Sequence, residues 1–138
     1  MVGRKRHILV DTLGFLLGLL VTEASVQDRD GGRTLLTALL GNAFGWLKRI
    51  WADSGYSGQF VADVAAITRH RKIELEIVKR SDSVKGFKVL PKRWIVERTF
   101  GWLVRNRRLV RDYEANIMHS EAMIYIAMTK TMLARVAR

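Results

Sequence analysis

Apolar and polar residues alternate along the chain in a way that predicts strands as well as helices. Apolar runs within residues 7–22 flank Leu13 and Gly14, a pattern typical of a hairpin whose glycine adopts a positive φ. Residues 47–53 form a short β-prone run, and residues 73–80 alternate with period two, so both segments are predicted as strands. The chain therefore contains at least one sheet.

Helical periodicity predicts four helices. They are expected at residues 31–41, 58–70, 91–110 and 120–136. In the first helix the leucines share one face, and either Asp28 or Asp30 could cap its start. In the last helix one apolar stripe repeats every four residues, at Ile124, Met128, Met132 and Val136. We interpret this methionine-rich stripe as core packing.

The order of these elements is β-β-α-β-α-β followed by two helices, which indicates an α/β class. A chain of 138 residues with 49% hydrophobic residues is long and apolar enough for one domain, residues 1–138, around one core. The tryptophans are assigned to packing by default, although their rings could stack on bases; they stand at 46, 51, 94 and 102.

The charge balance indicates a polyanionic partner. Lysine and arginine number 24 against 13 acidic residues, which gives a net charge of +11. Nucleic acid is the first candidate partner and an anionic membrane surface the second. The most apolar stretch, Leu13–Val21, is about half as long as a bilayer-crossing helix. Together with the absence of cysteine, this favours a cytoplasmic protein with no membrane association.

Asp53 lies in "RIWADSGYSG", between a β-prone run and a turn rich in glycine and serine. In an open α/β sheet, reactive groups gather at the carboxyl ends of strands, where Asp53 is predicted to lie. From the residues alone, the simpler interpretation is a turn aspartate that caps the helix starting near Gly58. Both interpretations stay open at this point.

Glu97 is the second candidate, because it is the single acid within a strongly basic segment. Between Lys92 and Arg111 there are seven basic residues, and on a continuous helix most of them share the face of Glu97. The opposite half is apolar, which predicts one core face and one phosphate-binding face. The candidate DNA-binding residues are Lys92, Arg93, Arg105, Arg107, Arg108 and Arg111. Glu97 could also be only a local salt-bridge partner of Arg93 or Arg98.

Four segments together resemble successive blocks of bacterial insertion-sequence transposases of the DDE class, in the insertion sequence five group. They are "GRKRHILVDTLG", "ASVQDRDGG", "WADSGYSG" and "WIVERTFGWL..R.RRL..DYE", in the family's order, and cover about residues 3–114. The resemblance implies an RNase H-like mixed sheet with flanking helices. It also implies DNA cleavage and strand transfer by two aspartates and one glutamate, which hold two Mg²⁺ or Mn²⁺ ions.

By this resemblance Asp53 matches the second aspartate and Glu97 the glutamate, so both are expected to be catalytic residues and metal ligands. Arg93 matches the basic member of the family's helix signature. Two positions depart from the pattern: Leu90 stands where a tyrosine is expected, and Arg105 comes one position later than the usual basic residue. Hard Mg²⁺ prefers carboxylate oxygen, which agrees with these residue types.

The first aspartate of the triad belongs on the first, central strand of the family's fold, and no segment of this chain matches that strand. Asp11 corresponds to the end of the second strand and is interpreted as a hairpin turn residue. We therefore expect a truncated or frameshift-split half, inactive by itself, whose partners are DNA and either the upstream half or a second transposase copy. It would be cytoplasmic and nucleoid-associated. The alternative is a non-catalytic basic fragment that binds DNA or inhibits the transposase.

Overall fold

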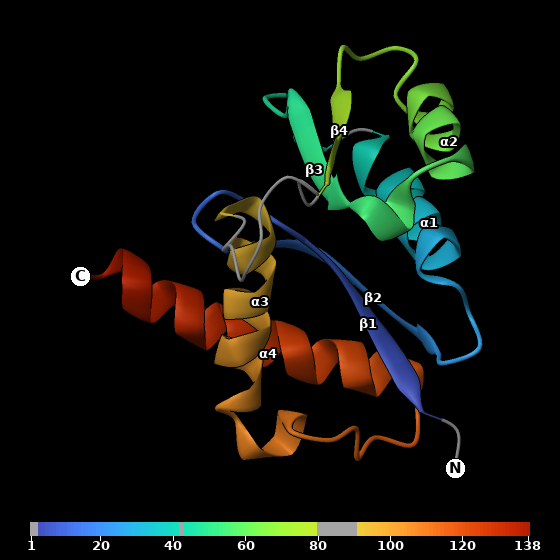
Figure 1. Cartoon of the computed structure of the whole chain (residues 1–138). Coiled ribbons are helices and arrows are strands. Elements are labelled where there is room, and N and C mark those ends of the chain that lie inside the picture. Colours follow the sequence, from blue (N-terminus) through green and yellow to red (C-terminus); the bar gives the residue numbers. More distant parts are fainter. Residues whose placement is uncertain (1–2, 42, 80–90) are drawn as a thin grey trace, which may run out of the picture. The chain divides into compact units, whose positions relative to one another are not determined.

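The computed structural model describes residues 3–41, 43–79 and 91–138, and the side chains of residues 91 and 93 lie outside this description. The chain forms two compact units (Figure 1). Unit 1 comprises residues 1–26 and 95–138, and unit 2 comprises residues 27–94. The described strands pair as two separate two-stranded sheets, one in each unit. This is a mixed α/β arrangement with small sheets and flanking helices, whereas the single RNase H-like sheet stays a prediction.

Unit 1 begins with the predicted hairpin. Strand β1 (Arg4–Val10) pairs with β2 (Leu16–Glu23) in antiparallel register, with an irregularity between Leu9 and Val10. In the connecting turn, one carboxylate oxygen of Asp11 accepts the amides of Leu13 and Phe15, each at 2.9 Å. Gly14 has φ +84°, as its place in the turn predicts. These contacts confirm the hairpin and the interpretation of Asp11 as a turn residue.

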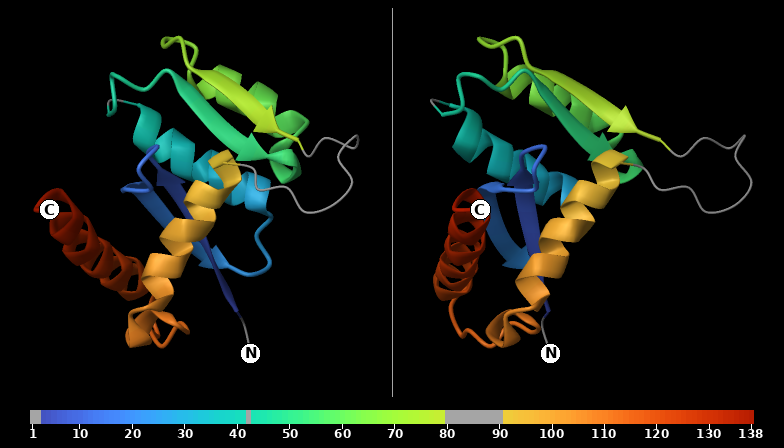
Figure 2. Two further views of the ribbon diagram at one scale, coloured as in Figure 1. Left: turned by 60° about the vertical axis from the view of Figure 1, so that its left-hand side comes forward. Right: turned by 90° about the vertical axis from the view of Figure 1, so that its left-hand side faces the viewer.

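Helices α3 (Pro91–Val104) and α4 (Ile117–Val136) complete unit 1, to which α3 belongs from Ile95 onward. Their apolar faces pack with β2 into one core. Figure 2 shows the ribbons of the hairpin and of these helices from two further sides. The buried core residues are Leu16, Leu19, Val21, Trp102, Leu103, Leu109, Ile124 and Met128. Met132 packs partly against this core, which confirms the methionine stripe as packing up to that point. Val136, the last member of the stripe, is 72% exposed.

The helix predicted at 91–110 ends at Val104, so this prediction is wrong for residues 105–110. Asn106 has an extended backbone and begins a 3-10 turn, η2 (Arg107–Leu109). The turn brings Leu109 into the core, while the neighbouring Val110 is 57% exposed. The basic residues from 105 to 111 therefore do not share one helical face with Glu97.

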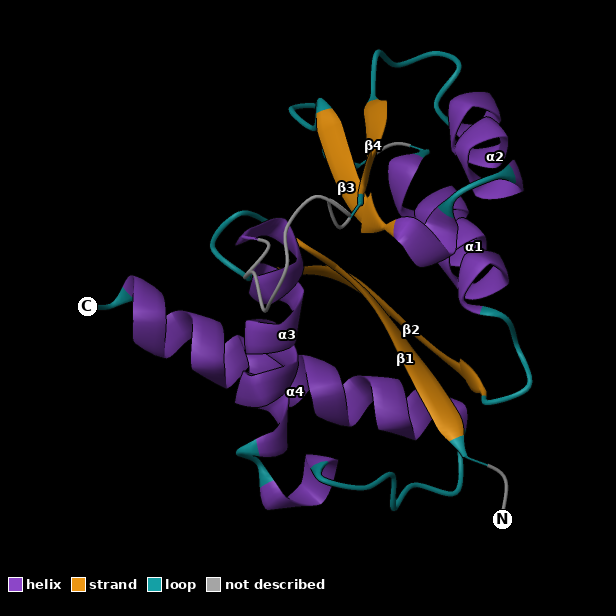
Figure 3. Cartoon of the chain, in the orientation of Figure 1, coloured by secondary structure: helices purple, strands orange, loops and turns teal. Residues whose placement is uncertain are grey.

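Among its described residues, unit 2 contains two strands and two α-helices besides the start of α3. Strand β3 (Arg49–Asp53) pairs with β4 (Glu74–Val78) in parallel, with Asp53 opposite Val78. Helices α1 (Asp28–Leu40) and α2 (Gln59–Ile67) pack together beside this pair (Figure 3). The predicted strand 73–80 ends at Val78, and Arg80 and the predicted loop 81–90 lie outside the described residues.

The N-cap of α1 is neither of the two aspartates that the sequence predicted. Gln27 occupies the N-cap position without a side-chain hydrogen bond, and Asp28 and Asp30 lie inside the first turn. There their negative charges are favourable next to the positive end of the helix dipole. Four residues into the helix, Gly32 meets the ring of Tyr56 so closely that a Cβ would lie 2.9 Å from Tyr56 Cε1.

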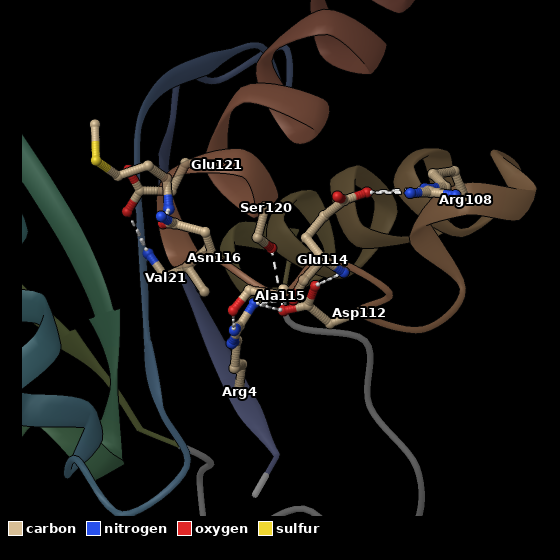
Figure 4. Close-up of polar contacts among 10 residues, drawn as sticks. Arg4, Val21, Arg108, Asp112, Glu114, Ala115, Asn116, Ser120 and Glu121 are labelled. Carbon is tan, nitrogen blue, oxygen red and sulfur yellow. Dashed lines mark hydrogen bonds and ion pairs between the residues drawn. The ribbon is translucent and has the colours of Figure 1, made fainter.

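A polar cluster around Arg4 fastens the connection between η2 and α4 to the hairpin (Figure 4). The Arg4 guanidinium donates to Asp112 Oδ2 at 2.9 Å and to the carbonyls of Glu114 and Ala115. Asp112 also accepts the Ser120 hydroxyl at 3.2 Å. Nearby, the carboxylate of Glu121 on α4 accepts the backbone amide of Val21 on β2 at 2.9 Å. The connection between η2 and α4, which carries Arg111, is thus held by charged hydrogen bonds.

We expect Gly14→Ala to lower the free energy of unfolding by about 1–3 kcal/mol, because the new side chain would adopt a left-handed backbone conformation. Its Cβ would also lie 2.9 Å from Thr99 Oγ1. Gly101→Ala in α3 is the matched control, since nothing lies within 4 Å of that position, and it should stabilise by up to ~1 kcal/mol. Urea unfolding measures both. An unchanged Gly14→Ala midpoint would contradict the turn geometry.

We also expect the stability of unit 1 to depend on pH through Asp112. Burial alone would raise the pKa of Asp112, but hydrogen bonds from the Glu114 amide, Arg4 and Ser120 outweigh it and lower the pKa below its ordinary value of 3.8. A group whose pKa is lowered in the folded state stabilises the fold at pH values above its unfolded pKa. This stabilisation is lost as the pH falls through the folded-state pKa. The melting-temperature gap between wild type and Asp112→Asn should therefore shrink below about pH 4. A gap that stays constant down to pH 2 would contradict this role.

Candidate functional site

Asp53 is the last residue of β3 and lies at the carboxyl end of the parallel strand pair, exposed to solvent. Its Oδ1 accepts the amide of Gly55 at 2.9 Å and so caps the 3-10 turn η1 (Ser54–Tyr56). The predicted cap of the helix near Gly58 is wrong, because α2 has Gly58 at its N-cap without a side-chain bond. A carboxylate has about four lone-pair directions, so one short cap leaves capacity for a further ligand.

Tyr56 is a neighbour of Asp53 that the sequence reasoning missed. Its ring packs on Phe60, with ring centroids 4.9 Å apart, and against Gly32 of α1. Burial, and then the negative charges of Asp28 and Asp53, raise the pKa of Tyr56 to about 12. The aromatic contact therefore fastens the turn that carries Asp53 to α1. In the sequence, this support is indicated by the tyrosine that stands three residues after Asp53.

Glu97 lies on α3 with its side chain on the exposed side of the helix. The next two residues anchor the helix to the hairpin turn. Arg98 Nη2 donates to the carbonyl of Leu13 at 2.6 Å, and the buried Thr99 hydroxyl donates to the carbonyl of Gly14 at 2.7 Å. Because Thr99 and Trp102 face the core, Glu97 is directed away from it.

Asp53 belongs to unit 2 and Glu97 to unit 1, so their meeting at a shared metal pair stays a prediction. Among the described residues, no group of three or more histidine, aspartate or glutamate side chains is placed to hold a metal ion. The metal role of each carboxylate therefore depends on how a complete site assembles.

The predicted DNA-binding residues have different environments. The Lys92 ammonium lies 4.2 Å from the ring centroid of Trp51, and the Arg93 side chain is outside the described residues. Arg108 is bound to Glu114, with Nη2 to Oε1 at 2.7 Å. Arg108 is nevertheless exposed, and so are three further arginines after α3, namely Arg105, Arg107 and Arg111. After Val104 the basic segment is thus a folded connection with a 3-10 turn and not a continuation of α3.

The tryptophans also differ in their burial. Trp102 is buried between two cations, with Arg98 at 5.1 Å and Arg135 at 3.8 Å from its ring. Trp46 is 61% exposed and Trp94 is 46% exposed, so the default assignment of all tryptophans to packing is wrong for these two. Across the described residues, every helix is too short or too polar to cross a bilayer.

Comparison with known proteins identifies the family. The sequence model described as "Transposase DDE domain" matches residues 2–131. The chain is 34% identical over 118 residues to the "Putative transposase for insertion sequence element IS402" of Burkholderia cepacia, which covers 81% of the chain and 54% of that protein. The chain thus spans about half the length of this relative, and no solved structure matches it. With nearly its whole length matched, the chain belongs to the transposase DDE domain family.

Proposed function

We propose that this chain is the part of a DDE transposase that supplies Asp53 and Glu97 to a metal-dependent site for DNA cleavage and strand transfer. The observation that carries the proposal is the place of Asp53, an exposed carboxylate at the carboxyl end of a parallel strand pair, in a chain of this family. Parallel strands present their carboxyl ends at one edge, where reactive groups and their ligands meet.

The residues fit a hard divalent cation. Asp53 and Glu97 are exposed residues with carboxylate side chains, the ligands that Mg²⁺ and Mn²⁺ prefer. Two bound ions would supply activation of the attacking hydroxyl and stabilisation of the leaving oxygen in an in-line displacement at phosphorus. The turn cap at Gly55 and the packing of Tyr56 hold the Asp53 carboxylate in place, and the Arg98 and Thr99 bonds hold the helix of Glu97.

A third carboxylate is part of the proposal. The described residues hold no cluster of three potential ligands, and the chain covers about half of its relative. We infer that an aspartate from an upstream transposase half, or from a second copy, completes an RNase H-like site. The exposed arginines after α3 would then bind phosphates of the transposon end or of the target DNA.

We expect cleavage to require both carboxylates. When the chain is joined to the upstream part of a transposase, Mg²⁺- or Mn²⁺-dependent nicking of element ends should fall at least ~100-fold in Asp53→Asn and in Glu97→Gln. Asp30→Asn, which removes an exposed carboxylate in α1, is the control and should cleave normally. Binding of Mn²⁺, followed by electron paramagnetic resonance, should weaken in the same two variants. Wild-type cleavage by either variant would remove that residue from the site.

A second candidate function is a non-catalytic fragment that binds DNA and inhibits the transposase. The net charge of +11 and the absence of a three-ligand cluster among the described residues favour it. The two functions differ in one observable property, because an inhibitor binds DNA ends without cutting them, even when the upstream part is present.

Both functions predict salt-dependent DNA binding through the exposed arginines. Replacing Arg105, Arg107 and Arg111 by alanine should reduce the slope of log affinity against log salt by about 2–3, at roughly 0.9 per phosphate contact. A control with the same loss of charge is Lys79, Lys130 and Arg138 replaced together, which should change the slope less. Filter binding between 50 and 300 mM salt measures the slopes. Equal slopes in the two triple variants would show that this loop makes no specific phosphate contacts.

A further inference from the structure

A groove of about 740 Å³ lies in unit 2, at the amino ends of β3 and β4. The residues that matter here are Lys48, Arg49, Trp51, Arg71, Lys72 and Glu74. Arg49 and Glu74 are the first residues of the two strands, whereas Asp53 and Val78 are the last. Four residue steps of a strand span about 13 Å, so the groove is separate from the candidate metal site.

The groove carries an unbalanced positive charge. Arg49 is neutralised by Glu74, with Nη2 to Oε2 at 2.7 Å, and lies 3.7 Å from Glu76. Arg71 is held by carbonyl oxygens instead of a carboxylate, at 3.0 Å from Leu40 O and 2.7 Å from Ala43 O. Within the described part of the chain, Lys48 and Lys72 make no ion pair. Three cations therefore face the groove without an acidic partner.

Aromatic rings accompany these cations. Trp51 is half-buried, and its indole nitrogen donates to Glu76 Oε2 at 3.0 Å, which fixes the ring in place. Trp46 stands between Gly45 and Leu47, which line the groove, but is not itself a lining residue. It is 61% exposed and edge-on to Phe44, with ring centroids 5.7 Å apart. An exposed indole held by a second ring offers a flat apolar surface with little freedom to lose on binding.

We propose that this groove binds single-stranded DNA, with Lys48, Arg71 and Lys72 on the phosphates and Trp46 stacked on a base. Cations along a groove with one indole, Trp51, in its wall and another, Trp46, beside it form an arrangement that suits single strands, since every base has a face to stack and every linkage has a charge. A duplex fits less well because its bases are already stacked on each other. The groove volume suits a nucleotide-sized group. Binding here needs neither Asp53 nor a metal ion.

The test uses the full chain, a fluorescein-labelled 15-mer of thymidine and EDTA, with fluorescence anisotropy as the readout. Lys48→Ala with Lys72→Ala should raise the Kd at least tenfold and lower the salt slope by about 1.4. The control pair Lys79→Ala with Lys130→Ala loses the same charge outside the groove and should change the Kd less than threefold. Trp46→Ala should raise the Kd about tenfold, and Trp46→Phe should restore most of the affinity.

Three results would overturn the proposal. They are no measurable binding of the 15-mer, equal losses in the two lysine pairs, or equal affinity for an abasic strand of the same length, which would indicate a phosphate site without stacking. Stronger binding of a 15-base-pair duplex would also contradict it. Asp53→Asn and Glu97→Gln should bind the 15-mer like wild type in EDTA, so failure of the catalytic proposal and failure of this one give different results.

Discussion

Two carbonyl oxygens in the hairpin turn, those of Leu13 and Gly14, are the anchor on which unit 1 depends. They accept hydrogen bonds from Arg98 and Thr99 on α3, a helix more than eighty residues further along the chain. Such bonds are strong where water is excluded, and the Thr99 side chain is fully buried. The turn exposes these carbonyls because Gly14 adopts a conformation that other residues avoid. One glycine thus sets the position of the helix that presents Glu97.

In unit 2, the two ends of one short strand pair carry side chains of opposite charge. The carboxyl end carries Asp53 and a glycine-rich turn, and the amino end carries the cationic groove. Two carboxylates on β4 bind residues of β3: Glu74 accepts from the Arg49 guanidinium, and Glu76 accepts from the Trp51 indole nitrogen and orients its ring. A strand pair of this length is marginal by itself. The buried leucines of α1 and the packing of the Tyr56 ring on Gly32 stabilise this strand pair.

The sequence predicted those features that local chemistry decides. Gly14 and Asp11 specify the hairpin turn, and the four-residue period of α4 identifies Ile124 and Met128 as core. Helical periodicity failed after Val104, because no glycine or proline marks the break and the burial of Leu109 is a tertiary effect. Asp53 and Glu97 were singled out by their positions and surroundings, and the motif resemblance supplied their expected metal role, whereas the packing of Tyr56 on Gly32 is a tertiary contact. The groove was missed because its lysines come from two loops that are far apart in the chain.

The hydrogen bond from Val21 to the Glu121 carboxylate has a consequence for how the hairpin can grow. An amide on the outer side of β2 is already occupied by a side chain of α4, so an incoming segment cannot complete a backbone ladder along that side. The edge of β2 is thereby protected at this position by a side chain, without a further strand or a proline.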